Sequence, residues 1–204
     1  MSHTYRKPSQ PRSIATEQRF LDALNELLAG KTLNQISIDE IAHHAMLTHS
    51  AFLKRFGTKK QALFVLWERY GQRALIVKQR LMDDLPNCSD VLDACYMVSA
   101  AIEALQRDDF SANRAMYDDF EEEMRIHPIT KMVFIACVDL VLNIRIRFME
   151  PAAKRDARDF AAAQLLITLN FNYVMRAMPG FSAESDERHR LIARLVAETL
   201  KPVQ

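Results

Sequence analysis

Apolar side chains recur at intervals of three and four residues along almost the whole chain, the pattern of helices that bury one face. The first such segment places four apolar residues on one side: Phe20, Leu24, Leu27 and Leu28. Gly30 follows them, as glycine commonly follows a helix. Residues 1–12 lack this periodicity and carry two prolines, so we interpret them as a flexible basic arm.

A short segment, residues 37–56, carries the signals of two small helices separated by a tight break. Ser37 followed three residues later by Glu40 is the signature of a capping box, which begins a helix. Thr48 can cap a second helix, which would bury Phe52 and Phe56 one turn apart. Small residues at the expected crossing allow the two helices to pack closely. This spacing is typical of a helix-turn-helix.

Helical patterns continue toward the end of the chain, and proline or glycine marks most of their boundaries. Further helices are expected over residues 59–85, 89–107, 111–127, 129–149, 154–178 and 185–200. No stretch alternates between apolar and polar residues as a strand does, and we find no internal repeat. The chain is therefore predicted to be all-α, with about nine helices.

The composition agrees with this prediction and excludes several classes of protein. The 204 residues include 4 Gly and 7 Pro, too few for a turn-rich β architecture. The longest apolar run, residues 132–138, is far shorter than the roughly 20 residues of a membrane span. The N-terminus lacks the apolar core of a secretory signal. The cysteines form no CxxC pair, so we expect a cytoplasmic location without disulfides or zinc: Cys88, Cys95 and Cys137.

The formal net charge of +1 conceals an asymmetry between the two parts of the chain. Residues 1–80 hold 13 Lys and Arg against 6 Asp and Glu, whereas residues 81–204 hold 14 against 20. A basic front part is suited to a polyanion, and the acidic remainder is not. The charge distribution therefore favours nucleic-acid binding by the segment that contains the expected helix-turn-helix.

Residues 14–63 resemble the DNA-binding domain of the TetR family of transcriptional regulators. The family pattern of Ile-Ala, Ala-Gly-Val-Ser, a small-residue helix start, an aromatic pair, Phe and Lys is matched by Ile41-Ala42, Ala45-Met46-Leu47-Thr48, Ser50-Ala51-Phe52, Phe56 and Lys59. Three residues depart from it. Met46 and Ser50 replace glycines, and Leu53 replaces a tyrosine whose hydroxyl commonly reaches a phosphate.

The resemblance implies roles for individual residues. Phosphates would be contacted by Ser37, Thr48, Lys54 and Lys59. Base edges would be contacted by His49, Ser50 and Ala51, and Leu53 lies on the same outward face. The packing of the expected helices agrees, because burying Phe52 and Phe56 leaves these side chains on a helix small enough for the major groove.

The resemblance also implies a domain order. The helix-turn-helix domain would comprise residues 13–58, a connecting helix residues 59–85, and a ligand-binding and dimerisation domain residues 86–204. We expect a homodimer formed through residues 154–178 and 185–200, because their long apolar faces need a partner surface. The run Ala161–Ala163 would permit the helices to approach closely.

The same resemblance implies a ligand cavity, although most of the residues concerned would serve equally well as ordinary core. The candidates are Trp67, Tyr96, Met116, Tyr117, Phe120, Met124, Phe134, Asn170, Phe171 and Tyr173. Because this set is apolar and rich in methionine, we expect a small hydrophobic effector, neutral or weakly cationic, rather than a metal or nucleotide. The acidic run 118–123 is either a solvated helix face or an attraction for a cationic ligand.

No catalytic motif is present, and adjacent His43 and His44 point apart on a helix, so we expect no enzyme, metal or cofactor. The chain is predicted to be a DNA-binding regulator, a repressor released from a palindromic operator by its effector. The alternative is a TetR-like protein-interaction module that does not bind DNA specifically. Salt-dependent binding to arbitrary duplex distinguishes the two.

Overall fold

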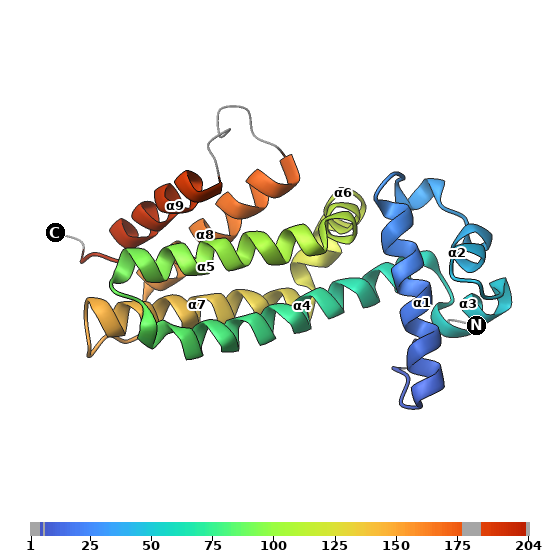
Figure 1. The fold of residues 1–204 in the computed structure, drawn as a ribbon, viewed down its shortest axis with the longest axis horizontal. Helices are drawn as coiled ribbons and strands as arrows, with labels where there is room; N and C mark the ends of the chain where they lie inside the picture. The colour runs from blue at the N-terminus through green and yellow to red at the C-terminus, as the bar shows by residue number, and fades with distance from the viewer. Residues whose placement is uncertain (1–4, 6, 177–184, 203–204) are drawn as a thin grey trace. The chain divides into compact units, whose positions relative to one another are not determined.

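The computed structural model describes residue 5, residues 7–176 and residues 185–202 (Figure 1). Within these ranges the chain is all-α, with nine α-helices, two short 3-10 turns and no strand, which confirms the predicted fold class. The chain divides into two compact units. Unit 1 comprises Met1–Tyr70 and Ser111–Arg125, and unit 2 comprises Gly71–Phe110 and Ile126–Gln204.

Unit 1 is built around a cluster of aromatic rings. Its elements are α1 (Pro11–Leu28), η1 (Leu33–Gln35), α2 (Ile38–His44), α3 (His49–Phe56), the first part of α4 (Lys59–Asp84) and most of α6 (Phe110–Ile126). The Phe20 ring of α1 meets the Phe52 ring of α3 edge to face, with centroids 5.3 Å apart. Phe52 and Phe56 are 5.0 Å apart, and all three are buried. These rings hold α3 against α1.

The observed division differs from the predicted domain order, because α6 joins the N-terminal helices. Arg114 of α6 donates to the Leu28 carbonyl at the end of α1 at 2.8 Å. The rings of Phe64 and Phe120 lie 5.8 Å apart, and the Lys60 ammonium contacts Glu123 at 2.8 Å. Helix α4 contributes residues to both units. Such contacts link residues far apart in the sequence, so local pattern does not reveal them.

Helix α6 is interrupted at Phe120, whose backbone angles (φ −143°, ψ 34°) are not helical. The Lys60 ammonium lies 4.6 Å from the centroid of the Phe120 ring. The predicted helix over residues 111–127 therefore exists with nearly the expected bounds, but it consists of two segments joined at Phe120.

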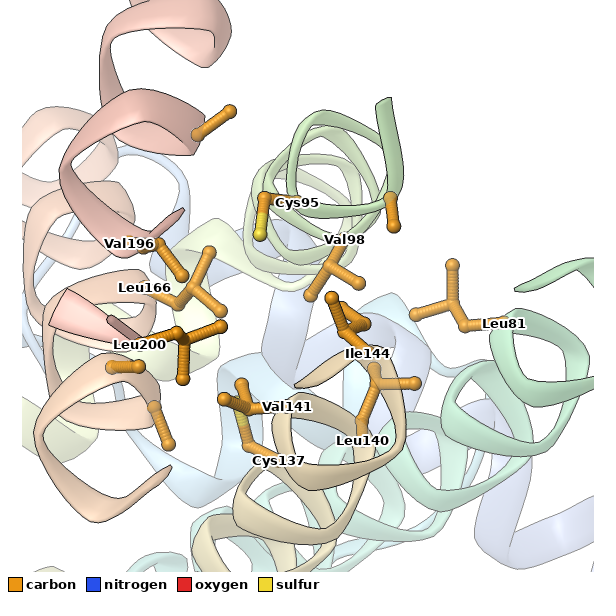
Figure 2. Packing of buried hydrophobic residues seen from close by; sticks show 14 of the residues in the cluster. Leu81, Cys95, Val98, Cys137, Leu140, Val141, Ile144, Leu166, Val196 and Leu200 are labelled. Carbon is orange, nitrogen blue, oxygen red and sulfur yellow. The ribbon is translucent and has the colours of Figure 1, made fainter. Parts of the chain in front are cut away.

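Unit 2 packs five helices around one apolar core. Its elements are the remainder of α4, η2 (Leu85–Asn87), α5 (Val91–Asp108), α7 (Pro128–Phe148), α8 (Ala157–Arg176) and α9 (Ser185–Thr199). Figure 2 shows side chains from all five helices converging on this core. The labelled residues are Leu81, Cys95, Val98, Cys137, Leu140, Val141, Ile144, Leu166, Val196 and Leu200. All three cysteines have free thiols.

Helices α4 and α7 approach each other closely at a glycine. A Cβ atom placed on Gly71 would lie 2.0 Å from the Ile129 Cγ1 atom, far closer than two carbon atoms approach without overlap. Gly71 is buried, and its lack of a side chain makes room for Ile129. Any larger residue at position 71 would require the Ile129 side chain or one of the two helices to shift.

Several predicted boundaries shift by a few residues for local reasons. Asp90, rather than Ser89, caps α5, because its carboxylate accepts from the Asp93 N–H at 2.9 Å. Asp93 in turn accepts from the Ser89 N–H at 2.9 Å. Helix α8 begins at Ala157 rather than residue 154, and the end predicted for it at residue 178 lies outside the described residues.

The apolar face predicted for the last helix is divided in the structure. Ile192, Val196 and Leu200 of α9 are buried in the core of unit 2, whereas Leu191 and Leu195 are 42% and 44% exposed. In the run Ala161–Ala163, only Ala161 is exposed, and the other two alanines are buried within the same core. Most of the alanine run therefore serves packing within one chain.

Candidate nucleic-acid interface

The two helices of the expected helix-turn-helix begin at the residues whose side chains can cap them. The Ser37 hydroxyl accepts from the Glu40 N–H at 3.0 Å at the start of α2. The Thr48 hydroxyl accepts from the Ala51 N–H at 3.2 Å at the start of α3. The Glu40 carboxylate accepts a hydrogen bond from Lys31, and this bond lowers the pKa of Glu40. Both predicted caps are present in the structure.

The turn between α2 and α3 contains the departure noted at Met46. This residue has φ 52°. Among the described residues it is the only residue other than glycine with a positive φ. Arg19 of α1 donates to the carbonyl oxygens of Ala45 at 2.5 Å and Met46 at 3.0 Å. The turn that the family builds with glycine is thus formed here with a strained methionine and tied to α1.

Helix α3 exposes the face on which the base-reading residues were predicted. His49, Ser50, Leu53 and Lys54 are exposed, and Ala51 is partly buried. The Thr48 and Ser50 hydroxyl oxygens lie 3.1 Å apart. The buried faces of Phe52 and Phe56 fix the rotation of the helix, so its polar side is available to a partner.

His49, the first residue of α3, contacts Asp39 of α2. Its Nδ1 atom lies 2.6 Å from the Asp39 Oδ1 atom, and both side chains are exposed. A second histidine of this unit makes a comparable contact, in which His44 Nε2 lies 2.6 Å from Glu26 Oε2. Neither His44 nor Glu26 lies on α3.

Lys59 has a different environment from the one that the resemblance implied. Its ammonium donates to the Leu33 carbonyl at 2.7 Å and also to the Ile36 carbonyl. Leu33 begins η1 and Ile36 directly follows it, so Lys59 ties this segment, which precedes α2, to the start of α4. Direct phosphate binding by this side chain would require both bonds to break, so the geometry favours a structural role for Lys59.

A buried carboxylate, Glu17 of α1, links several parts of unit 1. It accepts from Arg69 of α4 at 2.9 Å and from the Tyr5 hydroxyl at 3.0 Å. Burial and the neighbouring Glu17 charge both raise the pKa of Tyr5. Tyr5 lies within the segment predicted to be a flexible arm, and its ring stacks near Phe56 with centroids 6.2 Å apart. Part of that arm is therefore bound to the unit.

The ten candidate ligand residues fall into both units. Trp67, Met116, Tyr117, Phe120 and Met124 belong to unit 1, and the other five, Tyr96, Phe134, Asn170, Phe171 and Tyr173, belong to unit 2. Trp67 is buried and stacks on Tyr70 with centroids 4.9 Å apart. The Asn170 amide, expected to orient the polar end of a ligand, instead contacts Ser99 at 3.1 Å and the Leu166 carbonyl at 2.8 Å.

Unit 2 contains a buried polar network that the sequence analysis missed. Glu103 of α5 accepts hydrogen bonds from Arg188 of α9 and from Arg107, the latter at 2.6 Å. His189 Nε2 lies 3.0 Å from the Glu103 Oε2 atom, and His189 Nδ1 lies 2.8 Å from the Ser99 hydroxyl. Residues 85 positions apart meet here, and helical periodicity carries no signal for such pairing.

The network has the residue types of a hydrolytic triad but not the access that a triad needs. Ser99, His189 and Glu103 are linked in that order, yet Ser99 is 0% exposed. A nucleophile must reach its substrate, so this chain of hydrogen bonds stabilises the packing of α5 against α9. Burial would raise the pKa of Glu103, but the bonds from Arg107 and Arg188 outweigh it, and the pKa is lowered.

A second buried ion pair organises the connection between α7 and α8. The Arg145 side chain is buried and forms two bonds with Asp159, Nε to Oδ1 at 3.0 Å and Nη2 to Oδ2 at 2.7 Å. Arg145 also donates to the Lys154 carbonyl at 2.8 Å and to Glu150 at 3.0 Å. These bonds hold residues 150–156 as a loop, which explains the late start of α8.

The part of the chain that the structure describes shows no candidate metal site and no candidate membrane-spanning helix. Within it, no group of three or more histidine, cysteine, aspartate or glutamate side chains is arranged to hold a metal ion. No described helix is long and apolar enough to cross a membrane.

The fold is shared with solved TetR-family regulators over nearly the whole chain. PfmR from Thermus thermophilus is 16% identical, with a TM-score of 0.62, covering 90% of this chain and 100% of its own. FadR from Bacillus subtilis, solved with stearoyl-CoA, is 14% identical with a TM-score of 0.65, covering 89% and 98%. AibR, solved with isovaleryl-CoA and operator DNA, is 11% identical with a TM-score of 0.59, covering 88% and 97%.

No family model matches the sequence, and no curated protein is significantly similar to it. The chain has the fold of TetR-family transcriptional regulators. The resemblance noted for residues 14–63 is thereby confirmed as a likeness of fold that extends along the chain.

Proposed function

We propose that this protein is a ligand-responsive, DNA-binding transcriptional regulator, and that it acts as a repressor. The observation that carries the proposal is the exposed face of α3. His49, Ser50 and Lys54 lie on this face, and Phe52 and Phe56 on the opposite face are buried in unit 1. The fold supports it, since AibR was solved with operator DNA.

A helix of this size suits the major groove. A helix with its side chains is about 10–12 Å across, which fits the roughly 12 Å width of the major groove in B-form DNA, and the 8 residues of α3 extend for about 12 Å. The backbone N–H groups at its N-terminus, next to Thr48, are suited to a phosphate. Two copies related by a dimer axis would read half-sites about 34 Å apart, so the operator would be palindromic.

The dimer would form through α8 and α9. Supporting this, Phe160 of α8 and Leu191 and Leu195 of α9 are 38%, 42% and 44% exposed, so both helices present apolar side chains outside the core of unit 2. Leu195→Glu should yield monomers in sedimentation and abolish operator binding. Arg194→Glu, which changes the charge by two units rather than one at the neighbouring exposed polar position, serves as the control for charge alone. A monomeric wild-type protein at micromolar concentration would contradict the proposed dimer.

The effector would be a small molecule with a large apolar part. FadR and AibR were solved with stearoyl-CoA and isovaleryl-CoA, so acyl-CoA thioesters are the first probes to test, with free CoA as the control. An effector releases DNA by binding better to the conformation that does not fit the operator. Titration should change the fluorescence of Trp67, the single tryptophan, and lower operator affinity.

The decisive experiment is selection of bound sequences from a random duplex pool. Enrichment of a palindrome supports the proposal, and affinity for that palindrome should fall steeply as salt rises. Failure to enrich any sequence would overturn it in favour of a protein-interaction module that does not bind DNA specifically.

A further inference from the structure

The contact between His49 and Asp39 determines which hydrogen-bonding groups α3 can present. Nδ1 of His49 lies 2.6 Å from Oδ1 of Asp39. An ionised carboxylate only accepts hydrogen bonds, so the proton of a neutral imidazole must reside on Nδ1. The other ring nitrogen, Nε2, then carries a lone pair and can only accept. Among the residues that the structure describes, the His49 ring has no second hydrogen-bond partner.

An acceptor on α3 has a defined set of partners in the major groove. Adenine and cytosine present an exocyclic amino group there, at N6 and N4, whereas guanine and thymine present carbonyl oxygens at O6 and O4. A neutral His49 ring held by Asp39 can therefore accept a hydrogen bond from adenine or cytosine, but not from guanine or thymine. Without Asp39 the ring could rotate or change tautomer and bond to either kind.

We propose that Asp39 is a positioning residue for sequence recognition, which orients His49 so that Nε2 reads an amino group of adenine or cytosine at one position of each half-site. This inference rests on the proposed DNA-binding function and adds a specificity rule to it. Asp39 is also a negative charge beside the binding face, so it opposes binding to phosphates irrespective of sequence. The Asp39 carboxylate would thus increase discrimination between bases and decrease the affinity for DNA of any sequence.

A matched control exists within the same unit. Glu26 contacts His44 Nε2 at 2.6 Å, and both side chains are exposed, as are those of Asp39 and His49. The two pairs share residue chemistry, distance and exposure, but His44 lies on α2. Removing Glu26 tests the general effect of breaking an exposed histidine–carboxylate pair.

The experiment uses full-length protein and the operator obtained by selection, at about pH 8. At each half-site position, the base on one strand is changed from one that presents an amino group to one that presents a carbonyl group, or the reverse. The exchanges are A·T for G·C and C·G for T·A. For the wild type we expect one position at which the amino base is preferred by about five- to tenfold. Asp39→Ala and His49→Ala should each abolish most of that preference, and the double variant should lose no more than either alone. Glu26→Ala should retain it.

Asp39→Asn separates the two effects of the carboxylate. The amide oxygen of asparagine can still accept from Nδ1, although its NH2 group can instead donate to that atom, so the amino preference should return in part. The charge is absent, so affinity for non-specific duplex should rise by about two- to fivefold at low salt, as with Asp39→Ala. A role of Asp39 in stability alone would change neither readout.

Two results overturn the inference while leaving the proposed function intact. One is an amino preference that survives in Asp39→Ala, and the other is a wild-type preference for keto bases at the position that His49→Ala affects. A wild-type protein that enriches no sequence overturns the proposed function and this inference with it.

Discussion

His49 of α3 and His189 of α9 each contact a carboxylate, but in opposite surroundings. His49 Nδ1 lies 2.6 Å from Asp39 in unit 1, with both side chains exposed. His189 Nε2 lies 3.0 Å from Glu103 in unit 2, with both side chains buried. The buried pair has further polar neighbours, since Glu103 also accepts from Arg107 and Arg188.

Exposure to water determines what each pair contributes. Exposed charges keep most of their hydration, so forming the pair changes the free energy of folding little. Buried charges have lost their hydration, so each becomes costly if its partner is removed. The pair in unit 1 therefore contributes little to stability, which agrees with its proposed role in recognition, and the pair in unit 2 holds α5 against α9.

Removing each carboxylate in turn should separate the two cases most clearly. Glu103→Ala removes the buried carboxylate that Arg107, Arg188 and His189 share and should lower the free energy of unfolding by about 3–5 kcal/mol. Asp39→Ala should lower it by less than about 1 kcal/mol. Urea unfolding at one fixed protein concentration measures both, since the stability of the proposed dimer would depend on concentration. If the two variants lost similar amounts of unfolding free energy, the contrast between the buried and the exposed pair would be wrong.

Lys59 tests whether unit 1 also contains a structural charge close to its binding face. Lys59→Met removes the donor to the carbonyls of Leu33 and Ile36 and should lower the free energy of unfolding by about 1–3 kcal/mol. The matched variant is Lys54→Met on the exposed face of α3. It should change stability by less than about 0.5 kcal/mol and reduce the salt dependence of DNA binding by about one unit. If Lys59→Met instead reduced the salt dependence of DNA binding and left stability unchanged, Lys59 would be assigned to a phosphate again.

The buried pair should also make stability depend on pH. Burial lowers the pKa of His189 although the Glu103 charge opposes the shift. The unfolded chain, with an ordinary histidine pKa of 6.5, therefore binds a proton that the folded chain resists. Stability should fall as pH falls from about 7 to 5, with a slope from this group of at most about 1.4 kcal/mol per pH unit.

His189→Gln should remove that part of the slope while adding a pH-independent loss from the broken contacts. The charged groups around His189 are Glu103 and Arg107 of α5 and Asp186 and Arg188 of α9. Glu103 stays ionised in this window, because its own pKa is lowered. Unfolding free energies of wild type and variant that remain parallel from pH 7 to 5 would show that His189 does not titrate as described.

Local signals in the sequence predicted the helices and the outward face of α3. Ser37 and Thr48 cap helices through their own side chains, and the spacing of Phe52 and Phe56 sets which face is buried. Each of these signals lies within a few residues of the structure it specifies, so it can be read without knowing the tertiary fold.

Pairings between distant residues could not be predicted in this way. Glu103 meets Arg188, and Gly71 makes room for Ile129, yet no local pattern marks either pair. Lys59 looked like a surface cation because helical periodicity shows which residues are polar, but not which carbonyls they reach. The division of the chain into units was missed for the same reason, since Arg114 contacts the distant Leu28 carbonyl.

The smallest predicted effect concerns the turn that precedes α3. Met46 has φ 52° and is 81% exposed, so its Cβ is strained against the backbone while its side chain buries little surface. Met46→Gly removes the strain but gives the unfolded chain more freedom, and the net gain in unfolding free energy should be about 0.5–1 kcal/mol. Met46→Ala keeps the Cβ and should give no such gain. If glycine and alanine change the urea midpoint equally, backbone strain is not the cause. If only glycine raises it, strain is localised in the turn before α3, where Arg19 holds the carbonyls of Ala45 and Met46 in place.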